Sequence, residues 1–275
     1  MTSPGLLRLD NRPASVGTWL RELWKYRHVL VMLAKKDFRV RYKRASLGLA
    51  WAFAVPLLQS IVLVFVFSRV GRFGAGAHFS YAAFVLAGMV PWIYMSSTVA
   101  QSTQAVVDAS SLTDKVWFPR AILVLVPTLS GMVTLVVAVA ILLVELPIVG
   151  VPLGWNLLLV VPASIMAMAF SAGLGLVLAA AYVYFRDVRF IVQAVLLVWL
   201  YVTPIVYPAS VLKGSGPWLD YNPLTGIVTL FQRAALGTSI GDGRSILISA
   251  LVSIALLVAA VAIYRRHDRL FVDLL

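Results

Sequence analysis

Residue types that carry most enzyme chemistry are scarce or missing in this chain of 275 residues. It has no cysteine, which excludes structural disulfides, cysteine-ligated zinc and thiol catalysis. Its three histidines, His28, His78 and His267, fall in separate segments, so no metal site is expected. Only 12% of the residues are charged, and just 11 are acidic. Acid–base catalysis by paired carboxylates is therefore not indicated.

Sequence motifs of common enzymes are also missing. There is no GxxxxGK(S/T) phosphate loop, no GxSxG nucleophile elbow and no HExxH zinc pair. If the protein moves a substrate uphill, the energy must come from a partner or an ion gradient. We therefore expect no enzymatic activity and no cofactor bound by this chain.

Apolar sequence is what the chain has in abundance, at 61% of its residues. A transmembrane helix needs about 20 mostly apolar residues to cross roughly 30 Å of hydrocarbon. The pattern predicts an all-α integral membrane protein, in which polar residues make the second span the least apolar. The six expected spans are residues 47–67, 81–106, 121–144, 157–181, 190–207 and 246–264.

Positive charge is distributed unevenly around these spans. If all six cross the membrane, 18 of the 23 Lys and Arg residues fall on the side that holds both termini. The positive-inside rule then makes segments 1–45 and 265–275 cytoplasmic. We attribute the net charge of +12 to this topology and to anionic lipids, and expect no nucleic-acid binding. No cleavable signal peptide is recognisable, so the first span is expected to direct insertion.

Residues 18–38 have the pattern of an amphipathic helix that can lie in the cytoplasmic membrane interface. Arg27 and Asp37 interrupt its apolar arc, so a simple positive anchor for the first span remains the alternative. The arc consists of Leu20, Leu23, Trp24, Leu30, Val31, Ala34 and Phe38.

Polar and small residues mark faces of individual spans. In the second span, Ser97, Gln101, Gln104 and Asp108 share one face, which either hydrogen-bonds to other helices or lines a hydrophilic path. Glu145, at the outer end of the third span, is the only carboxylate adjoining a span, and nothing around it resembles a proton relay. A face that allows close helix packing in the fourth span consists of Ala167, Ser171, Gly175 and Ala179.

The outer segment 208–244 contains its own helix signals. Asn222 followed by Pro223 is a favourable helix start, and Gly237 is a favourable stop. The helix between them is expected in the outer interface, as a lid over an exit or as an amphipathic loop.

Short blocks of sequence follow one another in an order typical of one family. The blocks are Lys36-Asp37 with Arg39, Arg41-Tyr42-Lys43, Leu47-Gly48, Trp51 and Pro56; Gly88 to Trp92; Leu112 to Arg120; Tyr184 to Val188; Thr203 to Pro208; and Tyr221 to Leu224. Together they resemble the ABC-2 type permeases that export bacterial cell-surface polysaccharides.

This resemblance implies a multi-subunit exporter in the bacterial cytoplasmic membrane. Two copies of the permease would join two separate ATPase subunits, which bind ATP and Mg²⁺, and export a polyprenyl-linked O-antigen, capsule, teichoic acid or galactan chain. The N-terminal helix would lie beside the substrate entrance, and segment 208–244 would form an extracytoplasmic gate with short re-entrant or interfacial helices. Segment 108–120 would be a cytoplasmic coupling helix that contacts the ATPase through Asp114, Lys115, Phe118 and Arg120.

A sugar polymer needs aromatic faces and hydroxyl groups along its path. Candidates for the path, which are alternatively interface anchors or helix-packing residues, are Trp92, Tyr94, Ser97, Gln101, Trp199 and Tyr201. Arg39, Arg41 and Lys43 are candidates for the pyrophosphate of the carrier, or are plain topology signals. The alternative functions are an ABC-2 efflux permease for a drug or small lipid, and an ion-coupled carrier or membrane enzyme.

Overall fold

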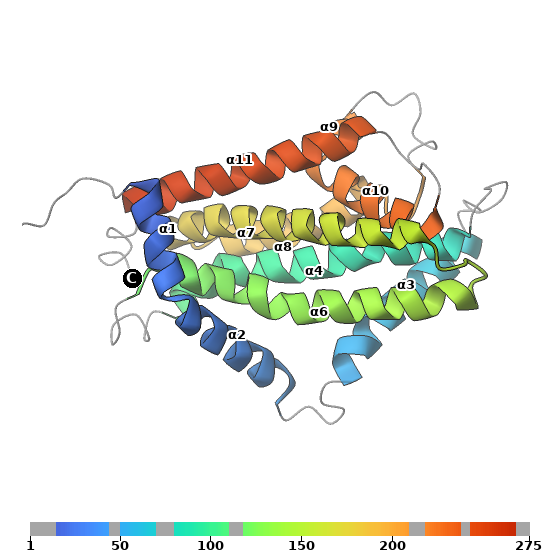
Figure 1. Cartoon of the computed structure of the whole chain (residues 1–275), viewed down its shortest axis with the longest axis horizontal. Helices are drawn as coiled ribbons and strands as arrows, with labels where there is room; N and C mark the ends of the chain where they lie inside the picture. The colour runs from blue at the N-terminus through green and yellow to red at the C-terminus, as the bar shows by residue number, and fades with distance from the viewer. Residues whose placement is uncertain are drawn as a thin grey trace, which may run out of the picture.

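The computed structural model describes residues 15–43, 50–69, 80–109, 118–208, 218–237 and 243–267, and in these residues it is helical without strands. The all-α prediction is confirmed there. Figure 1 shows the longer helices side by side, with α1 and α2 at one end. The elements are α1 (Val16–Lys25), α2 (Arg27–Tyr42), α3 (Trp51–Arg69), α4 (Tyr81–Asp108), α6 (Ala121–Ile148), η2 (Trp155–Leu159), α7 (Val160–Tyr184), α8 (Val188–Val202), α9 (Trp218–Tyr221), α10 (Pro223–Leu236) and α11 (Gly243–His267).

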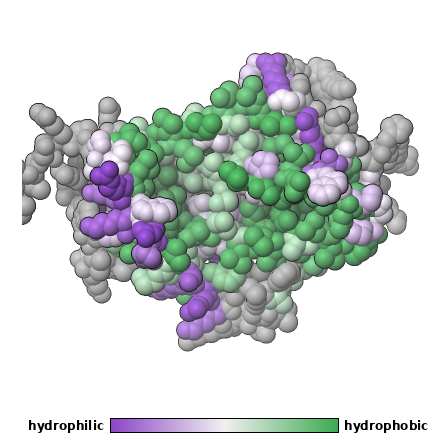
Figure 2. Space-filling model, viewed as in Figure 1, coloured by the Kyte–Doolittle hydropathy of each residue, from purple (hydrophilic) through white to green (hydrophobic). Residues whose placement is uncertain are grey.

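Four helical segments in the described part of the chain are long and apolar enough to cross a membrane. They are Tyr81–Asp108, Ala121–Ile148, Trp155–Tyr184 and Gly243–Tyr264, and each covers one of the expected spans. In α3 and α8 the apolar stretches are shorter, Leu57–Val66 and Val188–Val202. Figure 2 shows hydrophobic surface across the middle of the molecule and hydrophilic residues toward its two ends, as a membrane protein requires.

The helix within the fifth expected span, 190–207, stops at Val202, five residues before the expected end of the span. Thr203 is extended (φ −91°, ψ 138°), and residues 203–207 form a buried turn. Pro204 explains the stop, since a residue before proline is disfavoured in the α region and proline lacks the N–H that would continue the helix.

The core is centred on α4, which packs against α6, α7 and α10. Close approach of α4 and α7 depends on small residues, because a Cβ atom at Gly175 would lie 2.7 Å from the Ser102 Cβ. The predicted packing face of the fourth span is confirmed, since its four small residues are all buried in α7.

The single helix expected over residues 18–38 is wrong, because the chain bends at Tyr26 (φ −92°, ψ 12°) between α1 and α2. Helix α1 packs toward α11, whereas α2 packs along α6, so one straight helix cannot make both contacts. Arg27 and Asp37, which interrupted the predicted apolar arc, both make specific contacts in the structure. The Arg27 guanidinium lies 5.0 Å from the Trp24 ring centre beside the bend, and Asp37 forms an ion pair with Arg41.

Helix α10 begins and ends where its capping residues predicted. The Asn222 side chain accepts a hydrogen bond from the Leu224 amide at 3.1 Å, Pro223 is the first helical residue, and Gly237 adopts the left-handed conformation with φ +66°. Most of α10 is buried against α4, α7 and α11. The helix is therefore part of the protein core at this end of the bundle.

Candidate functional site

The ends of the expected coupling segment 108–120 are held by the N-terminal helices. Asp114 and Lys115 lie outside the described residues. Phe118 is buried and packs, with Ile122 and Leu123 of α6, against a partly buried group on α1 and α2. Arg120 directly precedes α6 and is half-buried. On α1 and α2 this group consists of Leu23, Tyr26, Leu30 and Leu33.

Trp19 is the buried anchor of α1, with 6% of its surface exposed, and sequence reasoning missed it. It belongs to a cluster with Val106, near the end of α4, and Ala121, at the start of α6. The cluster also takes in Ala179 of α7 and Tyr264 of α11. Helix α1 therefore covers the ends of four helices and touches both sides of the coupling segment.

The apolar arc predicted for the N-terminal segment divides between two directions. On α1, Leu20 and Trp24 are 51% and 69% exposed, so they point away from the bundle. Trp19 and Leu23, four residues apart and so on one helix face, point into it. The signal that could have found the inward face is the spacing of Trp19, Leu23, Tyr26, Leu30 and Leu33, which recurs every three to four residues.

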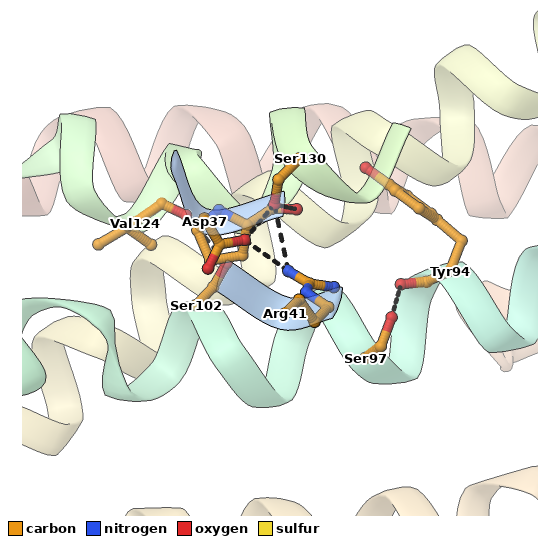
Figure 3. A network of polar contacts seen from close by, with 8 residues as sticks. Asp37, Arg41, Tyr94, Ser97, Ser102, Val124 and Ser130 are labelled. Atoms are coloured by element: carbon orange, nitrogen blue, oxygen red, sulfur yellow. Dashed lines mark hydrogen bonds and ion pairs between the residues drawn. The ribbon is translucent and has the colours of Figure 1, made fainter. Parts of the chain in front are cut away.

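A polar network attaches the last turns of α2 to the middle of α6. Arg41 Nη2 lies 2.5 Å from Asp37 Oδ2, and the Ser130 hydroxyl donates to the same carboxylate oxygen at 2.6 Å. Arg41 Nη2 also donates to Ser130 Oγ at 3.3 Å. Figure 3 shows both α2 side chains facing Ser130, which is buried in α6.

The three candidate pyrophosphate ligands differ in exposure and in whether they are already paired. Arg41 is half-buried and already paired, whereas Arg39 and Lys43 are exposed. Only Arg39 and Lys43 therefore present their cationic groups to an incoming anion without breaking an internal ion pair.

Of the candidate path residues on α4, the two aromatic ones lie in the protein core. Trp92 and Tyr94 are buried, and the Tyr94 hydroxyl donates to the Thr128 carbonyl of α6 at 3.2 Å. Ser97 and Gln101 are half-buried. The Ser97 hydroxyl donates within its own helix, to the Ile93 carbonyl at 2.8 Å. Within one copy of the chain, Trp92 and Tyr94 therefore act as packing residues.

The two candidates on α8 differ from each other. The Trp199 indole N–H donates to Asn222 Oδ1 at 3.0 Å, and its ring meets Phe170 edge-on with centres 6.1 Å apart. Tyr201 is 52% exposed. The six candidates thus lie in different environments. Within one copy of the chain they do not line one continuous path.

Asn222 organises a second polar network, which sequence reasoning missed. Besides binding Trp199 and the Leu224 amide, its side chain donates to Thr203 Oγ1 at 3.0 Å. Nearby, Gln232 Nε2 donates to the Pro204 carbonyl at 3.1 Å, and the Tyr81 hydroxyl donates to the Val206 carbonyl at 2.6 Å. The sequence blocks around residues 203–208 and 221–224 are therefore in direct contact, which fixes the turn after α8 beneath α10.

An apolar helical bundle with hydrophilic ends and long membrane-capable helices defines a multi-pass membrane protein. Residues 28–236 match the ABC-2 type transporter family, and the chain belongs to that family.

Three relatives match nearly the whole chain. An O-antigen export system permease protein, RfbA of Myxococcus xanthus, is 29% identical over 257 residues, covering 92% of this chain and 98% of the relative. The Klebsiella pneumoniae protein of the same name is 25% identical over 252 residues, covering 90% and 95%. The polysialic acid transport protein KpsM of Escherichia coli is 22% identical over 244 residues, covering 85% and 91%.

Proposed function

We propose that this chain is the permease subunit of a bacterial ABC exporter that moves a lipid-linked cell-surface polysaccharide across the cytoplasmic membrane. The observation that carries the proposal is near full-length similarity to permeases named for O-antigen and polysialic acid export. The family match over residues 28–236 supports a transport subunit, and neither it nor these relatives favour a drug-efflux role.

In this proposal two copies of the chain form the membrane pathway, and two copies of a separate ATPase supply the energy with ATP and Mg²⁺. Helices α3 and α8 complete six spans, and both termini are cytoplasmic. Support comes from the apolar exposed side chains of these two helices, such as Ile61 and Phe65 on α3 and Val195 and Val198 on α8. Such side chains need lipid or a second copy as their neighbour.

The coupling segment 108–120 docks on the ATPase, with Asp114, Lys115, Phe118 and Arg120 as its proposed coupling residues. The packing of Phe118 on α1 and α2 gives Phe118 an indirect role, because it transmits movement of the segment to the N-terminal helices. The contacts from α2 to Ser130 then carry this movement into the middle of α6.

The substrate enters beside α2. Arg39 and Lys43 receive the pyrophosphate of the polyprenyl carrier, while Arg41 holds α2 in place through Asp37. Tyr201, exposed on α8, is the aromatic candidate best placed to meet a sugar chain. Trp92, Tyr94 and Trp199 contribute to the path through their effect on the packing of α4 and α8. Ser97 and Gln101, which are half-buried on α4, remain candidates for direct contact with the sugar chain.

The test is purification of the tagged chain from its native membrane, with mass spectrometry of proteins and lipids that accompany it. We expect an ABC ATPase in equal amount and a polyprenyl-linked saccharide. A chain that purifies without an ATPase would favour an ion-coupled carrier. The double variant Lys115→Glu with Arg120→Glu tests the coupling segment in the same preparation, because it should weaken ATPase retention without reducing membrane insertion. Unchanged ATPase retention would contradict that assignment.

A further inference from the structure

A large groove lies between α3, α4 and α6, on the part of α6 that is far from α1 and α2. Its volume is about 860 Å³, within the range of small-molecule sites. Of the twelve described residues that line it, eleven are apolar, among them Ile61, Phe65, Leu86 and Ile141. Because α4 and α6 are membrane-capable helices, the groove is suited to hydrocarbon.

Glu145 is the one charged residue among the described groove lining. It is half-buried, and within the described part of the chain its carboxylate has no hydrogen-bond or ion-pair partner. It lies three residues before α6 ends at Ile148, which is about 4.5 Å along a helix axis. The carboxylate therefore sits near head-group depth at the end of an apolar groove.

A carboxylate in this position favours one head-group chemistry. Acids at membrane depth normally pair with another group, and an ammonium supplies both positive charge and hydrogen-bond donors. A polyprenyl phosphate or pyrophosphate carries only negative charge at its head, so the carboxylate would repel it, which disfavours the polyprenyl carrier as the occupant. An aminophospholipid also carries a phosphate, but its ammonium can face Glu145 while the phosphate points toward water. Because bilayer tails are as apolar as the groove, the apolar walls cannot select a lipid class. Among the described lining residues, selection must therefore come from Glu145.

We propose that this groove is a binding site for an aminophospholipid, with one acyl chain between α3 and α6 and the head-group ammonium paired with Glu145. The site lies at the C-terminal end of α6, whereas the coupling segment precedes the N-terminal end of this helix. It is therefore separate from the proposed entrance at Arg39 and Lys43. The inference rests on the membrane position of α6 and is independent of the exported substrate.

The experiment uses the full-length protein in nanodiscs that contain equal amounts of phosphatidylethanolamine, phosphatidylcholine and phosphatidylglycerol with identical acyl chains. Native mass spectrometry then counts the lipids that stay bound after the disc is removed. We expect phosphatidylethanolamine to be enriched about three- to fivefold over the other two, the range of a partly exposed ion pair. Glu145→Gln should abolish the enrichment, and Glu145→Lys should shift it to phosphatidylglycerol.

Two further variants test the groove itself. Ile141→Trp places a bulkier side chain in the groove, where it obstructs an acyl chain, and should reduce retained lipid of all three classes. Leu143→Trp is the matched control, because Leu143 is on the same helix, 36% exposed and outside the groove lining, so retention should not change.

Equal retention of the three lipids by the unaltered protein would overturn the proposal, as would an enrichment that persists in Glu145→Gln. A phosphorylated polyprenol carried over from the expression membrane and lost in Ile141→Trp would assign the groove to the substrate carrier instead. The readout is lipid binding and does not depend on the exported substrate. If the unaltered protein shows the enrichment but exports no polysaccharide, the proposed function fails and the lipid site stands.

Discussion

The two ends of the bundle are built differently. At the α10 end, side chains from α4, α8 and α10 donate to backbone carbonyls or to Asn222, and α10 packs on α11 through Gly226. At the opposite end, α1 and α2 rest on the bundle mainly through apolar contacts, with Trp19 buried on α1, Ala34 buried on α2 and a group of partly buried side chains around Phe118. The described polar link between α2 and α6 there is one partly exposed network.

This difference indicates which end is free to move. Buried hydrogen bonds to backbone break only at the cost of leaving polar groups unpaired. A partly exposed ion pair loses little when it opens, because water solvates both charges. The α1–α2 end, which also holds both ends of the coupling segment, therefore has the lower barrier to rearrangement.

The largest effect is expected from Gly226→Val at the tight end. A Cβ atom at this position would lie 2.6 Å from the Ile246 Cα, a backbone atom that cannot move aside without displacing α11. The Gly226 amide also donates to Ser249 Oγ at 3.0 Å, a bond that displacement would break. We expect a loss above about 4 kcal/mol, so that little folded protein accumulates.

The measurement is the yield of monodisperse protein after detergent extraction. Gly243→Val is the control, because a Cβ there meets nothing described within 4 Å. Equal yields of the two variants would show that α10 and α11 are not packed as tightly as the structure has them.

Trp19→Ala should have the next largest effect, confined to the α1 end. Truncating a buried tryptophan costs about 3–5 kcal/mol, but α1 can detach without unfolding the bundle, so most of the loss appears as local opening. Limited proteolysis should cut the N-terminal segment faster while the remaining chain stays resistant. Trp24→Ala removes an exposed tryptophan of the same helix and should leave the cleavage rate unchanged. Uniform destabilisation of the whole chain by Trp19→Ala would remove the contrast between the two ends.

Asn222→Leu should cost about 2 kcal/mol, because it leaves the Trp199 N–H and the Thr203 hydroxyl without their partner and removes the cap of α10. The apparent melting temperature in detergent should fall, in contrast to the exposed α8 variant Gln193→Leu. A melting temperature equal to that of the control would mean that water replaces the Asn222 contacts and that this end is looser than its geometry implies.

Sequence patterns predicted features that depend on neighbouring residues. The limits of α10 followed from Asn222, Pro223 and Gly237, because a cap acts within one turn of the helix it ends. The packing face of α7 followed from small residues at a four-residue interval.

Features set by distant contacts were not predictable in this way. The bend at Tyr26 arises because α1 and α2 pack on different helices, which no local pattern encodes. Trp19 was missed because a helix with two apolar faces does not reveal which one meets the bundle. The Asn222 network joins residues 19 to 28 positions apart in the α8–α10 region, and only the folded chain brings them together.

Ser130→Ala should have the smallest effect on stability and the most specific effect on α2. It removes the hydroxyl that joins α6 to Asp37 but leaves the ion pair of Asp37 and Arg41 within α2. The expected loss of about 1 kcal/mol corresponds to roughly fivefold faster amide exchange in the last turns of α2, without change in α10. Ser97→Ala is the control, because its hydroxyl bonds only to carbonyls of α4 in the described contacts. Unchanged exchange in α2 would mean that apolar packing alone holds α2 on α6, and that movement of the coupling segment reaches α6 through Phe118 and Ile122 instead.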